Sequence, residues 1–268
     1  MKTVLIGAGN VATHLGEALQ KAGCEILQVW SRTRSSAETL ADRLGCAWTT
    51  DVAQVSGEAE MYLFCVSDAV LESLSRQVFD AINASDVESE GKDTGSHALF
   101  VHTAGSMSQD VLPAARRGVL YPLQTFSRKR QVDFTQIPIF VESNTDEEQL
   151  MMLAELISNR VWALNEESRR YMHLAAVFAC NFTNHMYDLA SRILSERGIP
   201  FSALLPLIDE TARKVHEMQP GEAQTGPAVR HDTNVIARHL ALLNDEKMKE
   251  IYTLLSESIY DKLRPDAD

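Results

Sequence analysis

The sequence predicts an α/β fold, with a doubly wound sheet over residues 1–165 and an all-helical C-terminal domain over residues 166–268. A strand-like run at residues 3–6 leads directly into a glycine-rich turn. Strand-like and helical segments then alternate, which is typical of βαβ units in a parallel sheet. After the sheet domain, the apolar residues keep a helical period to the end of the chain. The length of 268 residues fits two domains of ordinary globular composition.

The glycine-rich turn at residues 7–12, Gly-Ala-Gly-Asn-Val-Ala, matches the fingerprint of Rossmann dinucleotide-binding sites. Gly7 permits a tight turn from strand to helix, and Gly9 lets the backbone approach a pyrophosphate. The amides that begin the following helix favour an anion. The alternative is a glycine turn without a ligand, but the strand before it and the helix after it favour a nucleotide. We therefore predict that a dinucleotide contacts Gly7, Ala8, Gly9, Asn10 and Val11.

Charge and cysteine content exclude several classes of partner. The chain carries a net charge of −12 at pH 7, and no Lys/Arg-rich patch offsets it. We therefore expect neither nucleic acid nor an anionic membrane as a partner. The four cysteines lack the spacing of a zinc site, so we expect no metal and reduced thiols in a cytoplasmic protein. The first apolar stretch ends at the glycine turn, so we expect no signal peptide and no membrane span.

A second strand-like run, at residues 25–30, ends in Ser31-Arg32-Thr33. An NAD site places an acidic residue at this point to bind the ribose 2′-hydroxyl, whereas an NADP site offers cationic and hydroxyl donors to the 2′-phosphate. No acid stands here, and Arg32 lies between two hydroxyl groups. The alternative is a solvated arginine at a strand end. The position favours NADP as the cofactor, with Ser31, Arg32 and Thr33 around its 2′-phosphate.

Two further strand ends are expected to line the same crevice. An apolar run at residues 61–66 precedes Ser67 and Asp68, and a run at residues 98–101 precedes the loop 102–106. Because ligands of open α/β sheets bind at the carboxyl ends of the strands, we predict cofactor contacts for Val66, Ser67, Asp68 and Thr103. Asp68 can also cap the next helix. His102 is a candidate proton donor at the nicotinamide end, with a structural role as the alternative.

The other elements follow from local pattern. Residues 83–97 are acidic and rich in Ser and Gly, so we expect an exposed loop. Further strands are expected at residues 118–126, 137–142 and 161–164, with a helix at residues 146–157. The helical domain is expected to contain helices over residues 166–197, 202–218, 227–243 and 246–263.

The first helix of the helical domain carries a polar stripe on a helical wheel. Its members are Arg170, His173, Asn181, Asn184, His185 and Asp188. A solvated face would normally be built from Glu, Lys and Arg, which are better helix formers than Asn and His. We therefore interpret the stripe as the lining of a cleft, with His173 and Asn181 as catalytic candidates. The alternative is that these side chains only satisfy polar neighbours.

A second candidate for substrate binding comes from the helical domain. Thr225-Gly226-Pro227 predicts a capped helix start that places Arg230 in the opening turns. A guanidinium group can hold a carboxylate through two parallel hydrogen bonds, so Arg230 is a candidate clamp for an anionic substrate. The alternative is an ion pair with Asp232 or Asp209.

The motifs GAGNVA, SRT, FCVSD, HTAGS, PLQTF, HLAAVFACNFTNH and TGPAVRHD follow one another over nearly the whole chain. In this order they resemble the Rossmann-like NADP oxidoreductases that carry a C-terminal helical domain of unknown function. The N-terminal half is also similar to deazaflavin-dependent NADP reductases and pyrroline-carboxylate reductases. The C-terminal half is similar to the helical domain of 6-phosphogluconate and 3-hydroxyacid dehydrogenases. The resemblance implies NADP, a cleft between the domains and a homodimer formed through the helices.

The chain departs from these relatives at two positions. The hydroxyacid dehydrogenases carry a catalytic Lys one turn before an Asn, whereas Val177 stands one turn before Asn181. Many relatives read His-Pro-Leu where this chain has Tyr121-Pro122-Leu123. Tyr121 can still donate a hydrogen bond, although an ordinary pKa near 10 makes it a poor base.

We therefore expect an NADP(H)-dependent oxidoreductase that transfers hydride to or from a small carbonyl, imine, hydroxy or amino substrate. Its hydrogen-bond donor to the substrate would be His173, Asn181, His102 or Tyr121, and the substrate is anionic if Arg230 binds it. The alternative is a non-catalytic NADP-binding or redox-sensing protein, because a fold alone does not establish a function.

Overall fold

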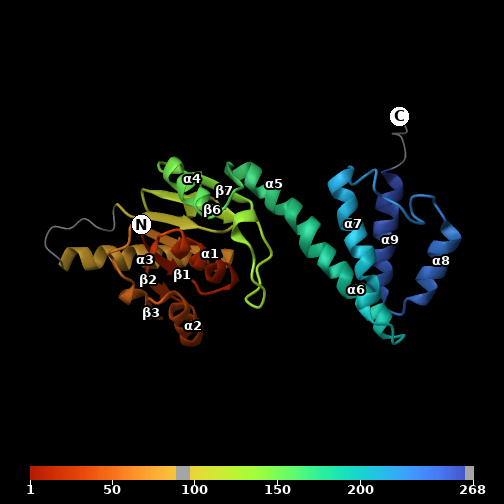
Figure 1. Ribbon diagram of the computed structural model, residues 1–268, viewed down its shortest axis with the longest axis horizontal. Coiled ribbons are helices and arrows are strands. Elements are labelled where there is room, and N and C mark those ends of the chain that lie inside the picture. The colour runs from red at the N-terminus through yellow and green to blue at the C-terminus, as the bar shows by residue number, and fades with distance from the viewer. Residues whose placement is uncertain (89–96, 263–268) are drawn as a thin grey trace. The chain divides into compact units, whose positions relative to one another are not determined.

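The computed structural model describes residues 1–88 and 97–262. The chain forms two compact units, residues 1–181 and residues 182–268 (Figure 1). The first unit contains a sheet with helices, and the described part of the second contains helices and turns. The predicted α/β fold with an all-helical C-terminal region is confirmed. Within the described ranges, no helix is long and apolar enough to cross a membrane.

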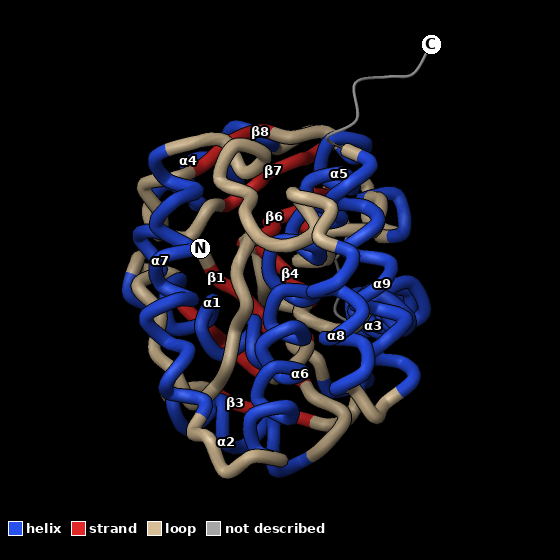
Figure 2. Tube along the Cα trace, turned by 90° about the vertical axis from the view of Figure 1, so that its right-hand side faces the viewer, coloured by secondary structure: helices blue, strands red, loops and turns tan. Residues whose placement is uncertain are grey.

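The first unit is built on an eight-stranded sheet of order β3-β2-β1-β4-β5-β6-β7-β8. Figure 2 shows the strands in red, from β3 at the bottom to β8 at the top. The strands β1 to β6 pair in parallel, β7 is antiparallel to β6, and β8 is parallel to β7. Their bounds are Lys2–Ile6, Glu25–Trp30, Ala47–Thr49, Met61–Phe64, Leu99–His102, Arg117–Pro122, Ile139–Ser143 and Val161–Ala163. The strand order reverses between β1 and β4, which is where doubly wound sheets bind nucleotides.

The α-helices of the first unit are α1 to α5. They span Asn10–Lys21, Arg34–Leu44, Asp68–Glu88, Glu147–Glu155 and Glu166–Ala176. A π-helical segment, Val177–Phe182, follows α5 directly. The α-helices of the second unit are α6 to α9, which span Thr183–Ser195, Leu205–Glu217, Thr233–Leu242 and Glu246–Asp261. The predicted domain boundary after residue 165 falls between β8 and α5 and stays a prediction, whereas the compact units divide after Asn181.

Two apolar clusters cover the two faces of the sheet. Leu5 and Leu63 face a cluster that includes residues of α1, α2 and α4. Ile6 and Phe64, one position along each strand, face a second cluster that includes residues of α3. Successive side chains of a strand point to opposite faces, so a strand covered on both faces must be apolar at every position. This is why residues 61–64 form an unbroken apolar run.

The structure corrects the predicted loop at residues 83–97. The helix α3 continues to Glu88, so residues 83–88 are helical, and residues 89–96 lie outside the described residues. The apolar side chains of Leu71, Leu74, Val78 and Ile82 hold α3 on the sheet. No Gly or Pro interrupts the chain after Ile82 until Gly91, so the helix has no local reason to stop earlier.

The predicted helix start at Pro227 is also wrong. Residues 226–231 form turns, and His231 adopts a φ of 51°, which a right-handed helix does not allow. The helix α8 begins at Thr233, and the carboxylate of Asp232 accepts a hydrogen bond of 3.1 Å from the amide of Val235. Asp is at least as strong an N-cap residue as the Thr225 of the predicted start. Arg230 therefore lies in a turn before α8.

Candidate functional site

The glycine turn lies at the carboxyl end of β1, beside the end of β2. Gly7 adopts a φ of +112°, and a Cβ atom at this position would overlap the carbonyl oxygen of Cys65. Its amide donates a hydrogen bond of 2.8 Å to the carbonyl oxygen of Trp30. Only glycine satisfies both the backbone angle and the close approach to β4. The turn is thereby fixed between the ends of β2 and β4.

The start of α1 fits an anionic group. Gly9 is its N-cap, so no side chain caps the helix, and no acidic residue occupies the first turn. A Cβ atom on Gly9 would meet no other atom within 4 Å, so the space in front of the turn is open. Uncapped amides at a helix start are unsatisfied donors that favour a phosphate. These residues fit the diphosphate of a dinucleotide.

The segment Ser31–Thr33 lies next to this turn, because the Gly7 amide is bonded to the last residue of β2. The side chain of Arg32 is exposed, and Thr33 is the N-cap of α2 without a side-chain cap bond. Arg34, the first residue of α2, stacks its guanidinium over the ring of Trp48 at 5.2 Å. An exposed cation beside a second uncapped helix start fits a 2′-phosphate. The roles of Ser31, Arg32 and Thr33 stay predictions.

The predicted contacts after β4 and β5 form one connected edge. Asp68 is the first residue of α3, and its carboxylate accepts a hydrogen bond from the hydroxyl of Ser106 in the loop after β5. The hydroxyl of Thr103 donates to the carbonyl oxygen of Phe64 at 3.4 Å. These bonds tie the loop after β5 to the loop after β4. Whether Val66, Ser67, Asp68 and Thr103 contact a cofactor stays a prediction.

His102 is fully buried, and both of its ring nitrogens have backbone partners. Its Nδ1 accepts a hydrogen bond of 3.1 Å from the amide of Ala104, and its Nε2 lies 3.2 Å from the carbonyl oxygen of Ser108. Burial, together with the charge of Arg169, lowers the pKa of His102 to about 4. The ring is therefore neutral at pH 7, with its proton on Nε2. This geometry favours the structural alternative over a role as proton donor.

Tyr121 and His173 form a pair at the carboxyl end of β6. The hydroxyl oxygen of Tyr121 lies 2.9 Å from Nδ1 of His173. A Cβ atom on Gly105 would lie 2.7 Å from both Nδ1 of His173 and Cζ of Tyr121, so the backbone of the loop after β5 packs directly on the pair. Burial raises the pKa of Tyr121 to about 12, which keeps its hydroxyl protonated at neutral pH. The structure thus brings together two of the predicted catalytic residues and the predicted loop.

A buried arginine that the sequence did not single out holds this loop in place. The side chain of Arg169 is fully buried and forms an ion pair with Glu142 at 2.9 Å. Its Nη1 donates to the carbonyl oxygens of Ala104, Gly105 and Met107 at 3.1, 2.9 and 2.8 Å. Four acceptors around one guanidinium fix the path of the loop that packs on Tyr121 and His173. In a sequence, a buried arginine cannot be distinguished from an exposed one. The acidic residue Glu142, at the end of a predicted strand, was the signal that could have indicated a buried partner.

A second missed segment, residues 124–130, is defined here as the strap. It follows β6 and reaches the glycine turn. The side-chain amide of Asn10 donates a hydrogen bond of 3.0 Å to the carbonyl oxygen of Phe126. The guanidinium of Arg128 donates to the carbonyl oxygen of Ala8. The predicted strand at residues 118–126 therefore ends at Pro122, and its last residues belong to the strap.

Two predicted catalytic residues belong to other segments of the sequence. Asn181 belongs to the π-helical segment, whose longer turns break the α-helical period on which the predicted stripe depends. Arg230 belongs to the second unit, in the turns before α8. The carboxylate of Asp232, one of the acids proposed to pair with it, caps α8 instead. The roles of Asn181 and Arg230 stay predictions.

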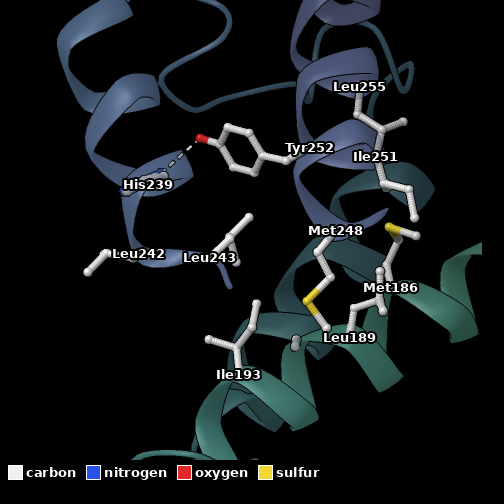
Figure 3. Close-up of a pocket in the computed structure, with 11 residues that line it drawn as sticks. Met186, Leu189, Ile193, His239, Leu242, Leu243, Met248, Ile251, Tyr252 and Leu255 are labelled. Atoms are coloured by element: carbon white, nitrogen blue, oxygen red, sulfur yellow. Dashed lines mark hydrogen bonds between the residues drawn. The ribbon is translucent and has the colours of Figure 1, made fainter. Parts of the chain in front are cut away.

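The second unit contains an apolar cavity of about 360 Å³ between α6, α8 and α9 (Figure 3). Leu189, Ile193, Leu242 and Ile251 are among its lining residues. Its main polar feature is a pair in which Nδ1 of His239 lies 2.8 Å from the hydroxyl of Tyr252. This lining suits apolar groups rather than a phosphate or carboxylate. Among residues 1–88 and 97–262, no group of three or more His, Cys, Asp or Glu side chains is placed to hold a metal ion.

Two family models match the chain. Residues 2–87 match a model described as NADP oxidoreductase, coenzyme F420-dependent, and residues 137–259 match a domain of unknown function, DUF2520. This is the combination of domains that the sequence motifs predict, so the predicted resemblance is confirmed. None of the curated proteins compared with the chain matches it.

Several solved structures share the fold. A Bacteroides fragilis protein, provisionally named an NADP oxidoreductase, is 47% identical over 97% of this chain and 98% of its own, with a TM-score of 0.88. A Thermotoga maritima protein is 22% identical over 97% and 99% of the two chains, with a TM-score of 0.74. An imine reductase from Myxococcus stipitatus, solved with NADP+, is 16% identical over 97% and 92%, with a TM-score of 0.64. The last two are similar to this chain in fold.

Proposed function

Because the chain belongs to the NADP oxidoreductase family of the Bacteroides fragilis protein, we propose that it transfers hydride between NADP(H) and a small carbonyl or imine substrate, or the corresponding alcohol or amine. The observation that carries the proposal is the Tyr121–His173 pair, with 2.9 Å between the Tyr121 hydroxyl oxygen and Nδ1. The pair packs on the same loop that begins at the crevice end of β5. A hydrogen-bond donor at that place is what reduction of a carbonyl or imine requires.

The cofactor, when bound, supplies the hydride, and the chain supplies binding and orientation. The glycine turn and the uncapped start of α1 fit the diphosphate, since their amides have no side-chain partner. Arg32, with Ser31 and Thr33, is proposed to bind the 2′-phosphate.

Tyr121 is proposed to protonate the substrate. With a pKa of about 12 it retains its proton at neutral pH. When Nδ1 of His173 carries a proton, this N–H donates a hydrogen bond to the Tyr121 oxygen. The Tyr121 hydroxyl is then free to donate to the carbonyl oxygen or imine nitrogen of the substrate. That substrate atom becomes more basic as the adjacent carbon gains hydride, so the phenolic proton moves to it. His173 then stabilises the phenolate by hydrogen bonding until a proton from solvent replaces the lost one.

The proposal also includes the charge of the substrate, the oligomeric state of the protein and its location. Arg230 is proposed to bind a carboxylate of the substrate through its guanidinium. A homodimer is proposed because the helices α6 to α9 bury none of their own residues. A cytoplasmic location is proposed because all four cysteines are free thiols.

The alternative function, a non-catalytic NADP-binding or redox-sensing protein, is favoured by one specific feature. Val177 stands where related dehydrogenases carry a catalytic Lys, and it lies at the start of the π-helical segment. A valine cannot transfer a proton. The two functions therefore differ in whether the Tyr121–His173 pair is sufficient for turnover.

Oxidation of NADPH in the presence of small ketones, 2-oxo acids and cyclic imines tests the proposal. Wild-type protein should turn over at least one of these substrates. Tyr121→Phe should lower kcat by roughly 10²- to 10⁴-fold, the range for a lost general acid, with unchanged NADPH affinity. Tyr171→Phe, at an exposed tyrosine of α5, is the matched control and should keep full activity. NADPH binding without turnover of any substrate would instead support the non-catalytic alternative.

A further inference from the structure

We propose that Arg128, carried by the strap across the glycine turn, binds the diphosphate of the dinucleotide. The inference rests on the proposed function, because it concerns how the same cofactor is held. It adds a cation from the loop after β6 to a site that the sequence motif places entirely at the start of α1.

The strap is attached to α1 by several contacts of the described residues. The side-chain amide of Asn10 donates to the carbonyl oxygen of Phe126 at 3.0 Å. Nε2 of His14 lies 2.9 Å from the carbonyl oxygen of Ser127. The rings of His14 and Phe126 stack with centroids 5.4 Å apart. Phe126 in turn stacks on the buried Phe134 at 6.0 Å, and Phe134 belongs to the cluster between α1 and the sheet. These contacts fix the backbone immediately before Arg128.

The position of Arg128 follows from these attachments. Its guanidinium donates one hydrogen bond, through Nη2, to the carbonyl oxygen of Ala8, between the two glycines of the turn. A guanidinium has five N–H donors in a planar fork, so the others remain for a ligand. The Arg128 side chain is exposed and Gly9 faces open space. A phosphate bound at the start of α1 therefore lies within reach of a guanidinium already held at the same turn.

Electrostatics explain why a cation is needed there. The chain has a net charge of −12, and the first turn of α1 contains Asn10, Val11, Ala12 and Thr13, none of them basic. The helix start supplies only about half a positive charge, which is less than the charge of a diphosphate. Arg128 is the cation that the strap holds at this turn, through its hydrogen bond to the carbonyl oxygen of Ala8.

The assignment differs from that of Arg32 in a measurable way. Arg32 is proposed to contact the 2′-phosphate, which NADPH has and NADH lacks. Arg128 is proposed to contact the diphosphate, which both nucleotides share. Adenosine 2′-monophosphate carries the 2′-phosphate and no 5′-phosphate, so it isolates the first contact from the second.

Dissociation constants of NADPH, NADH and adenosine 2′-monophosphate, measured by calorimetry on the full chain, test the proposal. Arg128→Ala should weaken NADPH and NADH by the same factor, roughly 10- to 150-fold, the value of a charged hydrogen bond. The affinity for adenosine 2′-monophosphate should not change. Arg32→Ala should weaken the binding of NADPH and of adenosine 2′-monophosphate but not that of NADH. Lys129→Ala, at the next cation of the strap, is the matched control and should leave all three constants near wild type.

The outcomes separate the two proposals. If Arg128→Ala binds NADPH as tightly as wild type, the Arg128 assignment is overturned and the proposed function is untouched. If it weakens all three ligands alike, the residue acts on the structure of the site rather than on the diphosphate, which also overturns the assignment. If wild-type protein binds neither NADPH nor NADH, the proposed function fails together with the inference.

Discussion

The two units of the chain differ in how much of their apolar surface they bury. In the first unit, the side chains of β1 and β4 at Leu5, Ile6 and Leu63 have no exposed surface. In the second unit, the helices α6 to α9 bury none of their residues. Leu207, Leu242 and Leu254 are 63%, 68% and 67% exposed. The first unit thus has a complete core of its own. The second has apolar residues of the kind found in cores, but its helices leave them exposed.

The difference indicates where each kind of function resides. A site built on the ends of buried strands can hold polar groups within fractions of an ångström, because neighbouring side chains fix every rotamer. Exposed leucines on several amphipathic helices, in contrast, mark a surface that another protein surface covers. We propose a second copy of this chain as that partner, with the cavity between α6, α8 and α9 receiving apolar side chains.

The largest expected effect therefore concerns assembly. Leu242→Glu places a charge in the apolar lining of the cavity, and burying it would cost several kcal/mol. We expect wild-type protein to sediment as a dimer at micromolar concentration and the variant to sediment as a monomer. Arg197→Glu, which puts a glutamate at an exposed position after α6 and outside the cavity lining, is the control and should remain dimeric. A monomeric wild-type protein would contradict the proposed dimer and leave the exposed leucines unexplained.

The next largest effect should arise in the first unit, at Arg169. Arg169→Met leaves the carboxylate of Glu142 and three loop carbonyls without their donor. Breaking a buried pair on one side costs about 3–5 kcal/mol, so the free energy of unfolding in urea should fall by that amount. Arg170→Met, at the exposed neighbour that pairs with Glu166, should change it by at most about 1 kcal/mol. An equal loss of unfolding free energy in the two variants would show that the buried Arg169 contacts stabilise the protein no more than an exposed ion pair does.

The elements of the sheet could be predicted because their signals are local. A buried parallel strand must be apolar at every position, and a glycine with a positive φ beside β4 cannot be replaced. The end of α3 could not be predicted in this way, because a polar segment continued a helix whose apolar face ends at Ile82. The predicted start of α8 was wrong because the sequence offers two N-cap residues, Thr225 and Asp232. The positive φ of His231 is incompatible with a helix that begins at the first of them.

The residues of the candidate site also differ in whether a local sequence signal indicates them. Tyr121 and His173 could be proposed separately, but their hydrogen bond joins β6 to α5 across 52 positions of the chain, so no local pattern indicates it. Arg169 and Arg128 were missed for a related reason. Both donate hydrogen bonds to backbone carbonyl oxygens, including those of Gly105 and Ala8. Because every residue has a backbone carbonyl, a sequence does not indicate which of them accepts such a bond.

A smaller effect is expected for cofactor selectivity. Arg32 stands beside the uncapped start of α2, so a charged hydrogen bond to a 2′-phosphate should be worth about 1.5–3 kcal/mol. Wild-type protein should therefore bind NADPH roughly 10- to 150-fold more tightly than NADH, and Arg32→Ala should lose most of that ratio. Arg34→Ala, at the arginine that stacks on Trp48, is the comparison. If Arg34→Ala loses the preference for NADPH and Arg32→Ala keeps it, the 2′-phosphate contact belongs to Arg34 of α2. Equal wild-type affinities for NADPH and NADH would contradict any such contact.

The smallest expected effect is a pH dependence of stability that originates in the first unit, at His102. Its folded-state pKa of about 4 lies below the ordinary value near 6.5, so protonation favours the unfolded chain. The stabilising contribution is complete above pH ~6.5 and is lost as the pH falls through 4. Between pH 7 and pH 5 the free energy of unfolding should fall by about 2 kcal/mol from this group.

Urea unfolding of wild-type protein and of His102→Gln at the two pH values isolates this contribution, because glutamine does not titrate. The wild-type curve should lose about 2 kcal/mol more than the variant between pH 7 and pH 5. His216→Gln, at an exposed histidine of α7, is the matched control and should keep the wild-type dependence. Parallel losses in all three proteins would mean that His102 accepts a proton while folded. Its Nδ1 would then be released from the amide of Ala104, and a role in proton transfer would again be open to it.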